Sequence, residues 1–236
     1  MRFTGFATGI LLASPASAAI TIDFDGIRNY DRPAAFYEGG SSIDAGTDHA
    51  TGLSGQNLGV SITDAAIVFQ AFDQCPGGGC NGIFPKAPTG NNAMYNWPAR
   101  TWLPAMSTFN VAAGFSGEAS VWHYGGASSF TIYAGLGGSE GASPTVLGFA
   151  AMPLTTGCTV DPGTLTVSGC GWTKYTVQFS GAARSIRLAG SGSYFDSISL
   201  GAPGVPEPES WALLVLGFAL TGAAMRRRGV ITRVAA

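Results

Sequence analysis

Short stretches in which apolar and polar residues alternate run through the middle of the chain and predict an all-β body. In Lys174–Phe179 the apolar residues at 175, 177 and 179 face one side of an extended chain and the polar residues at 176 and 178 the other. Many short strands separated by Gly, Pro, Asn and Ser turns favour a two-sheet β-sandwich. The predicted strands are Ile20–Phe24, Leu58–Thr63, Ala66–Gln70, Ser107–Val111, Ala119–Tyr124, Phe130–Ala134, Thr145–Ala150, Thr164–Val167, Lys174–Phe179, Ser185–Ala189 and Phe195–Leu200.

One long segment, Gln70–Pro104, lacks this alternation and is rich in Pro, Gly and Asn. We predict an irregular but ordered loop here, because the segment contains two cysteines that can close it.

The first residues form a different pattern. A single basic residue, Arg2, precedes the apolar stretch Phe3–Ala13, and small residues at Ala16 and Ala18 follow. This order is typical of a signal peptide over residues 1–18, cut by signal peptidase after Ala18 or Ala19. The alternative is a buried N-terminal helix.

The other end also carries an apolar run, Trp211–Met225, which follows Pro206, Glu207 and Pro208 and precedes Arg226, Arg227 and Arg228. As a helix the run covers about 22 Å, which is less than a hydrocarbon core of about 30 Å. The arginines favour the cytoplasmic side, and Trp211 suits the membrane boundary. The run predicts a single hydrophobic helix with transient membrane residence; a weak tail anchor and a packed C-terminal helix are the alternatives.

This order of features resembles the PEP-CTERM sorting signal of Gram-negative bacteria. The matching residues are Pro206-Glu207-Pro208, Trp211-Ala212, Gly217, Gly222 and Arg226-Arg227-Arg228. The resemblance covers about the last tenth of the chain. It implies recognition by exosortase, a membrane cysteine peptidase or transpeptidase, and removal of the tail. The expected organisation is a signal peptide (1–18), a β-sandwich (20–203) and a sorting signal (205–229).

The second half of the body resembles the galactose-binding-like jelly rolls found in such proteins. The similarity spans about Ser107–Leu200 and rests on two strands, Phe179–Ile186 and Phe195–Ile198. It implies a jelly-roll sandwich but does not identify a ligand, since such folds host lectins, accessory modules and scaffolds.

The net charge of the body restricts the kinds of partner that we expect it to bind. Of twelve Lys and Arg and fourteen Asp and Glu residues, five basic and two acidic ones lie in the removable ends. The body is left with a net charge of about −5 and has no basic stripe for phosphates, so nucleic acid is not an expected partner.

The four cysteines allow three disulfide pairings. We predict the two local pairs, Cys75–Cys80 and Cys158–Cys170, because both loops are short and export favours oxidation. A zinc site is disfavoured, because neither gap has the spacing of a ligand knuckle and no histidine lies near either pair.

The sequence contains few of the residue motifs that are typical of active sites. The two histidines are His49 and His123, and the G-x-S-x-G match at Gly137–Gly141 has neither a following helix nor a downstream histidine. His123 lies in a predicted strand beside Trp122 and Tyr124 and is expected to be structural. We therefore expect no enzyme.

Carboxylates suggest one metal hypothesis. Asp23 and Asp25 are two residues apart in the predicted first strand, so we expect them to share a face. Pairing of the first and last strands would bring Asp196 near Asp25, and with Glu38 these side chains are candidate ligands for a structural calcium. The alternative is that the first two are solvated and that Asp196 caps a turn; no other cofactor is expected.

Aromatic residues suggest a sugar site. Trp97 and Trp102 lie in the irregular segment and are the candidate carbohydrate platform, with packing over the sandwich edge as the alternative. The leading hypothesis is an exported, non-enzymatic protein of the cell envelope or extracellular matrix. The alternatives are a module that binds exopolysaccharide and a glycoside hydrolase that uses two carboxylates.

Overall fold

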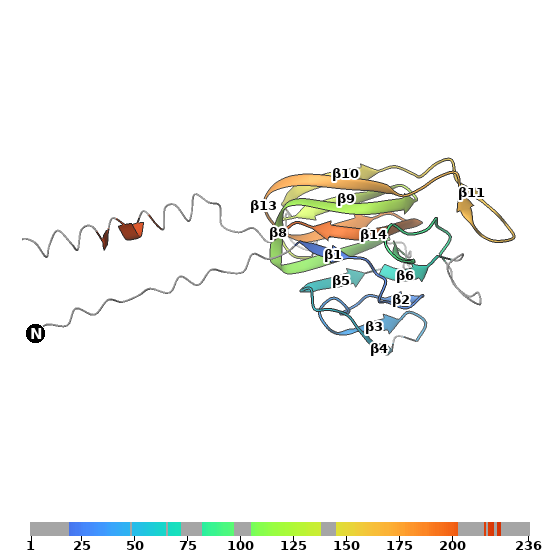
Figure 1. Ribbon diagram of the computed structural model, residues 1–236, viewed down its shortest axis with the longest axis horizontal. Coiled ribbons are helices and arrows are strands. Elements are labelled where there is room, and N and C mark those ends of the chain that lie inside the picture. The colour runs from blue at the N-terminus through green and yellow to red at the C-terminus, as the bar shows by residue number, and fades with distance from the viewer. Residues whose placement is uncertain are drawn as a thin grey trace, which may run out of the picture.

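The structure is a computed structural model that describes residues 19–47, 49–64, 66–71, 82–96, 105–137, 145–202, 215, 217–219 and 221–222. Most of them lie in β-strands (Figure 1). The strands are β1 (Ile20–Ile22), β2 (Asp31–Arg32), β3 (Ser41–Asp44), β4 (Ala50–Ser54), β5 (Val60–Asp64), β6 (Ala66–Gln70), β7 (Asn92–Asn96), β8 (Met106–Gly125), β9 (Ser128–Tyr133), β10 (Val146–Met152), β11 (Thr159–Val160), β12 (Val167–Ser168), β13 (Thr173–Ala189) and β14 (Ser193–Leu200).

Two long antiparallel strands, β8 and β13, organise the sandwich. The main sheet has the order β10-β9-β13-β8-β14-β7-β6, with β1 paired to β14 and β5 paired to β8. The first part of β8 pairs with β5 and with the end of β13, whereas its last part pairs with β14 and with the start of β13. The pairing register of β8 and β13 shifts between Phe179 and Ser185, where both strands bend. Each long strand therefore contributes residues to both halves of the sandwich.

The core lies between these halves. Phe109 and Ile186 come from the first half, Val121 and Phe195 from the second, and all four side chains are fully buried in one cluster. Alternating residues of paired strands point to opposite sides of a sheet, so both halves present one apolar face to this cluster.

Two smaller units adjoin the sandwich. Strands β2, β3 and β4 form a three-stranded sheet, and β11 and β12 form a hairpin that projects at one end of the body (Figure 1). A disulfide between Cys158 and Cys170 closes the base of the hairpin. This confirms one predicted pair; the other, Cys75–Cys80, lies outside the described residues.

The predicted all-β body and its sandwich architecture are confirmed, as is the pairing of the first strand with the last, Ile20 opposite Leu200. Two pairs of predicted strands, 107–111 with 119–124 and 174–179 with 185–189, are each one continuous strand. Antiparallel pairing continues past the glycines that suggested breaks, because positive φ at Gly114, Gly117 and Gly181 bends the strands without ending them.

The prediction of an irregular Gln70–Pro104 segment is wrong in part, because buried strand β7 lies inside it. Asn92 and Asn96 suggested turns, yet both are buried in the strand. Their side-chain amides donate to Ile27 O at 2.7 Å and to Leu188 O at 3.0 Å, respectively. Distant backbone carbonyls thus satisfy the amides that a turn would otherwise engage.

The first strand is shorter than predicted. It ends at Ile22, and Phe24 has a positive φ of 65°, so Asp23 and Asp25 do not share a strand face. Phe24 is fully buried, and its backbone amide donates to the Tyr37 hydroxyl at 3.0 Å. Burial of this ring stabilises a turn that local alternation would not indicate.

The predicted terminal helices fall largely outside the described residues. Residues 215, 217–219 and 221–222 are helical and exposed. Over the part of the chain that the structure describes, no helix has both the length and the apolarity needed to cross a membrane. The signal segment with Ala16 and Ala18, the motif Pro206–Pro208, Trp211 and the arginines Arg226–Arg228 are not described.

Candidate ligand-binding face

A row of tyrosines crosses the second half of the sandwich on the side away from the main core. Tyr95 in β7 is opposite Tyr194 in β14, and Tyr194 is opposite Tyr124 in β8. The residues that alternate with them, Met94, Phe195 and His123, point inward. The ring centroids of Tyr95 and Tyr194 are 4.7 Å apart and those of Tyr124 and Tyr194 are 6.1 Å apart.

Trp172, directly before β13, extends this row. Its ring centroid lies 5.7 Å from that of Tyr124, and its indole N–H donates to Pro85 O at 3.0 Å. Phe84 packs edge-on against Trp172 at 5.7 Å and also contacts Tyr194 at 4.8 Å. We call Tyr95, Tyr124, Trp172 and Tyr194 the aromatic face.

The rings of the aromatic face are partly buried. Tyr124 is only 6% exposed, whereas Tyr95, Tyr194 and Trp172 are half-buried. Beyond it, Tyr30 is 37% exposed and packs against Phe69. Tyr95, Tyr194 and Trp172 also pack against a second hydrophobic cluster, so only part of their ring surface is open to solvent. A partly exposed row of rings on a sheet suits a flat, amphipathic ligand.

The phenol groups of this face stay neutral at ordinary pH. Burial raises the pKa of Tyr95 and of Tyr124, and burial is also the largest cause that raises the pKa of Tyr194 to about 12. The Tyr194 hydroxyl already has a hydrogen bond with the backbone of Ile83, which opposes the rise in its pKa. A neutral phenol both donates and accepts hydrogen bonds, so it can bind a sugar hydroxyl beside the partner it has.

A second row borders the aromatic face. Lys174 in β13, Trp122 in β8 and Asp196 in β14 are aligned across three neighbouring strands. Lys174 is exposed, Trp122 is half-buried and Asp196 is fully buried. This row therefore offers a cation and an indole, whereas its carboxylate is covered.

Asp196 is covered by the segment 85–92. Its carboxylate accepts hydrogen bonds from Thr89 N at 3.0 Å, from Thr89 Oγ1 at 3.0 Å and from Ser197 Oγ at 3.3 Å. Burial raises its pKa to about 7; the hydrogen bonds oppose this, and the charge of Asp25 adds to it.

Asp25 binds the same 85–92 segment, at a point two residues after Thr89. Its Oδ1 accepts from Asn91 N at 3.0 Å and from Asn92 N at 3.3 Å. Gly90 lies between these contacts with φ +47°, and a Cβ there would lie 2.0 Å from the Asp25 carboxylate oxygens. Only glycine fits, so the two carboxylates together fasten residues 89–92 against the sheet.

The calcium hypothesis concerns Asp25, Asp196 and Glu38. The structure brings Asp25 and Asp196 to one segment as expected, but both carboxylates are occupied by protein donors. Glu38 instead lies at an isolated bridge with Asn57. No group of three or more His, Cys, Asp or Glu side chains suited to a metal occurs among the described residues. Calcium takes six to eight oxygen ligands, and its binding by Asp25, Glu38 and Asp196 stays a prediction.

His123 is structural, as predicted. It is 1% exposed, its Nε2 hydrogen-bonds with Gly126 O at 2.9 Å, and its ring packs near Tyr175 and Phe195. Burial lowers its pKa, so the neutral form prevails at neutral pH.

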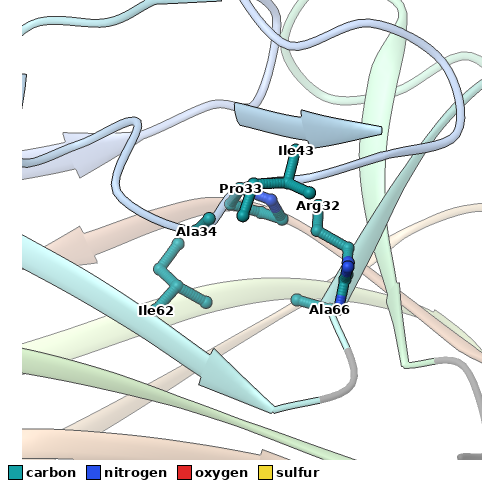
Figure 2. Close-up of a pocket in the computed structure, with 6 residues that line it drawn as sticks. All are labelled: Arg32, Pro33, Ala34, Ile43, Ile62 and Ala66. Carbon is teal, nitrogen blue, oxygen red and sulfur yellow. The ribbon is translucent and has the colours of Figure 1, made fainter. Parts of the chain in front are cut away.

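A small cavity lies elsewhere, between the three-stranded sheet and strands β5 and β6. It has a volume of about 170 Å³ and is lined by Arg32, Pro33, Ala34, Ile43, Ile62 and Ala66 (Figure 2). Its walls are mostly aliphatic, and Arg32 supplies the polar part.

The predicted carbohydrate platform, Trp97 and Trp102, lies outside the described residues. No sequence pattern singles out the aromatic face, because its residues come from three strands and the approach to a fourth. Tyr124 lies at the end of one predicted strand and Tyr194 directly precedes another, so the strand period alone does not bring them together.

No family model and no curated protein matches the chain. Among solved structures it is similar to the K2 cleaved adhesin domain of Lys-gingipain (12% identity, 78% of this chain and 99% of that one, TM-score 0.44). It is also similar to the carbohydrate-binding module CBM6cm-2 of Cellvibrio mixtus lichenase 5A (18% identity, 59% of this chain and 98% of that one, TM-score 0.27). A third similar structure contains the CBM22-1 and GH10 modules of Clostridium thermocellum xylanase 10B (11% identity, 63% of this chain and 27% of that one, TM-score 0.32). At these TM-scores the function is argued from this chain's own residues.

Proposed function

We propose that the β-sandwich is a carbohydrate-binding domain that holds a polysaccharide on the aromatic face. One observation carries the proposal: Tyr95, Tyr194, Tyr124 and Trp172 form a continuous row of rings on the outer side of a rigid sheet, and three of the four are half-buried.

The chemistry of this row suits sugars. A pyranose ring has an apolar face of C–H groups and an edge of hydroxyls. The first packs on an aromatic ring, and the second hydrogen-bonds to neutral phenols, an indole or nearby polar side chains. Several rings in a row suit a polymer, because successive sugars then contact successive side chains.

Binding without catalysis is part of the proposal. Two candidate acid–base groups on the strands of this face already have structural partners: Thr89 and Ser197 donate to Asp196, and His123 hydrogen-bonds with Gly126 O. A catalytic acid or base needs access to the reacting atoms, and both of these groups are buried.

The finer part of the proposal concerns location. We propose that the domain is exported through the inner membrane of a Gram-negative bacterium and acts at the cell surface or in the extracellular matrix. Signal peptidase and exosortase would process its ends. The Cys158–Cys170 disulfide is compatible with an oxidising compartment, and the terminal patterns around Ala16–Ala18 and Pro206–Arg228 support the processing steps.

Affinity electrophoresis through gels that contain a panel of soluble polysaccharides tests the binding. The wild type should be retarded by at least one polymer, and Trp172→Ala should weaken that binding by about tenfold, because one stacking ring is lost. Phe149→Ala is the matched control, because Phe149 is 59% exposed but lies on edge strand β10, away from the aromatic face.

Thermal unfolding of each variant checks that it is folded. A wild type that no polymer retards, or a folded Trp172→Ala protein that binds as well as the wild type, would contradict the proposal.

A further inference from the structure

The chain contains two lysines, Lys86 and Lys174, and the backbone of each lies within two residues of Trp172 or of its hydrogen-bond partner Pro85. Lys86 follows Pro85, whose carbonyl accepts the Trp172 indole hydrogen bond at 3.0 Å. Lys174 is two residues after Trp172 and pairs with Trp122 across the sheet. Residues almost ninety positions apart are thus brought to the same ring.

Neither ammonium group has a partner within the described structure. Both lysines are exposed, and the described residues provide them with no hydrogen bond or ion pair. Three arginines differ in this respect: Arg28 contacts Asp31, Arg184 donates to Ala112 O, and Arg187 donates to Gly137 O. The two lysines are therefore cations available to a ligand.

The surrounding charges do not cancel them. Asp196 belongs to the same cross-strand row as Lys174, with Trp122 between them, but it is fully buried and hydrogen-bonded to Thr89 and Ser197. The body carries a net negative charge of about −5, which repels anions in general. Two free cations beside the aromatic face create a local exception to that repulsion.

We propose that the aromatic face selects an anionic polysaccharide, whose sugar rings stack on Trp172 and its neighbours while its acidic groups pair with Lys86 and Lys174. This inference rests on the proposed carbohydrate binding and names the class of polymer. Lysine suits the role because its ammonium is a compact charge on a flexible stem that can follow a mobile chain.

The test uses the full-length protein and two matched pairs of polymers. Polygalacturonate is compared with its fully methyl-esterified form, and dextran sulfate with dextran, so that charge changes while the backbone stays the same. Binding is measured by affinity electrophoresis at low and high salt. The variants are Lys86→Gln/Lys174→Gln, the matched control Arg184→Gln, and Trp172→Ala.

The wild type should bind at least one charged polymer about tenfold more tightly than its neutral partner, as expected for two exposed ion pairs. High salt should reduce this preference, because it screens exposed charges. The double lysine variant should lose the preference, Arg184→Gln should keep it, and Trp172→Ala should weaken binding to both members of the pair. The pair that shows the preference identifies the acidic group as carboxylate or sulfate.

Equal binding of charged and neutral partners, or a preference that survives the double lysine variant, overturns the anionic selectivity and leaves carbohydrate binding intact. A wild type that binds neither these four polymers nor any in the wider panel overturns both proposals. The lysines are exposed, so their replacement by Gln should leave the melting temperature unchanged.

Discussion

Asp196 lies fully buried beneath the 85–92 segment, where Thr89 and Ser197 supply its hydrogen bonds. Burial raises its pKa to about 7, from an unfolded value near 3.8. Between these values the folded protein retains a proton that the unfolded chain releases. This contribution to stability is fully present below about pH 4 and is lost as pH rises to about 7.

Replacing Asp196 by Asn should remove this dependence while keeping an oxygen that can accept from Thr89 N. Relative to the wild type, the variant should gain stability as pH rises from 5 to 8, by about 2–3 kcal/mol. Urea denaturation of both proteins at several pH values measures the difference. The lowered pKa of His123 affects both proteins alike, so it cancels. A difference that does not change with pH would show that Asp196 is ionised in the folded state throughout this range.

At the scale of elements, the hairpin β11–β12 places its disulfide next to the aromatic face. The disulfide joins Cys158 to Cys170, two residues before Trp172, and both cysteines pack against the cluster that contains Tyr124 and Phe84. The hairpin therefore contributes to the surroundings of the ring on which the proposed binding depends.

Loss of this disulfide should lower the free energy of unfolding by about 2–3 kcal/mol, because the unfolded chain gains the freedom of a short closed loop. The comparison is Cys158→Ser/Cys170→Ser against the wild type in urea without reductant, with the reduced wild type as a further control. Equal unfolding midpoints would mean that the hairpin opens before the sandwich unfolds. Peptide mapping without reductant would also test the predicted Cys75–Cys80 pair.

At the scale of the whole molecule, the chain combines a weakly charged β-body with two ends of different chemistry. The body has few cations, while Arg2, Arg226, Arg227 and Arg228 lie in the terminal patterns. Such a distribution suits a domain that leaves the cytoplasm and loses both ends.

Intact-mass measurement of the protein recovered from the cell surface or medium tests this processing. The mature protein should lack residues 1–18 and the tail from Trp211 to Ala236, because signal peptidase and exosortase would remove them. Replacing Arg226–Arg228 by Ser should impair processing, since the basic stop is lost. Recovery of surface protein that still carries the three arginines would contradict the sorting proposal.

The sequence by itself was sufficient for properties that depend on neighbouring residues. A short run of β-branched and aromatic residues predicted β6 at its observed bounds, Ala66–Gln70, and a short loop predicted the Cys158–Cys170 pair. Alternation also predicted that Tyr175, Val177 and Phe179 share one face, and all three lie in or against the main core, because side chains in a strand have a period of two.

Only the tertiary structure decided what depends on contacts between distant residues. Strand β7 pairs with β6 and β14, and its buried asparagines donate to Ile27 O and Leu188 O; no local pattern encodes those partners. Asp25 and Asp196, predicted as metal ligands, bind the backbone of residues 89–92. The aromatic face and its two lysines also come from segments up to about 110 positions apart. A single sequence shows which residues alternate, but not which strands become neighbours, because pairing depends on burial summed over the whole core.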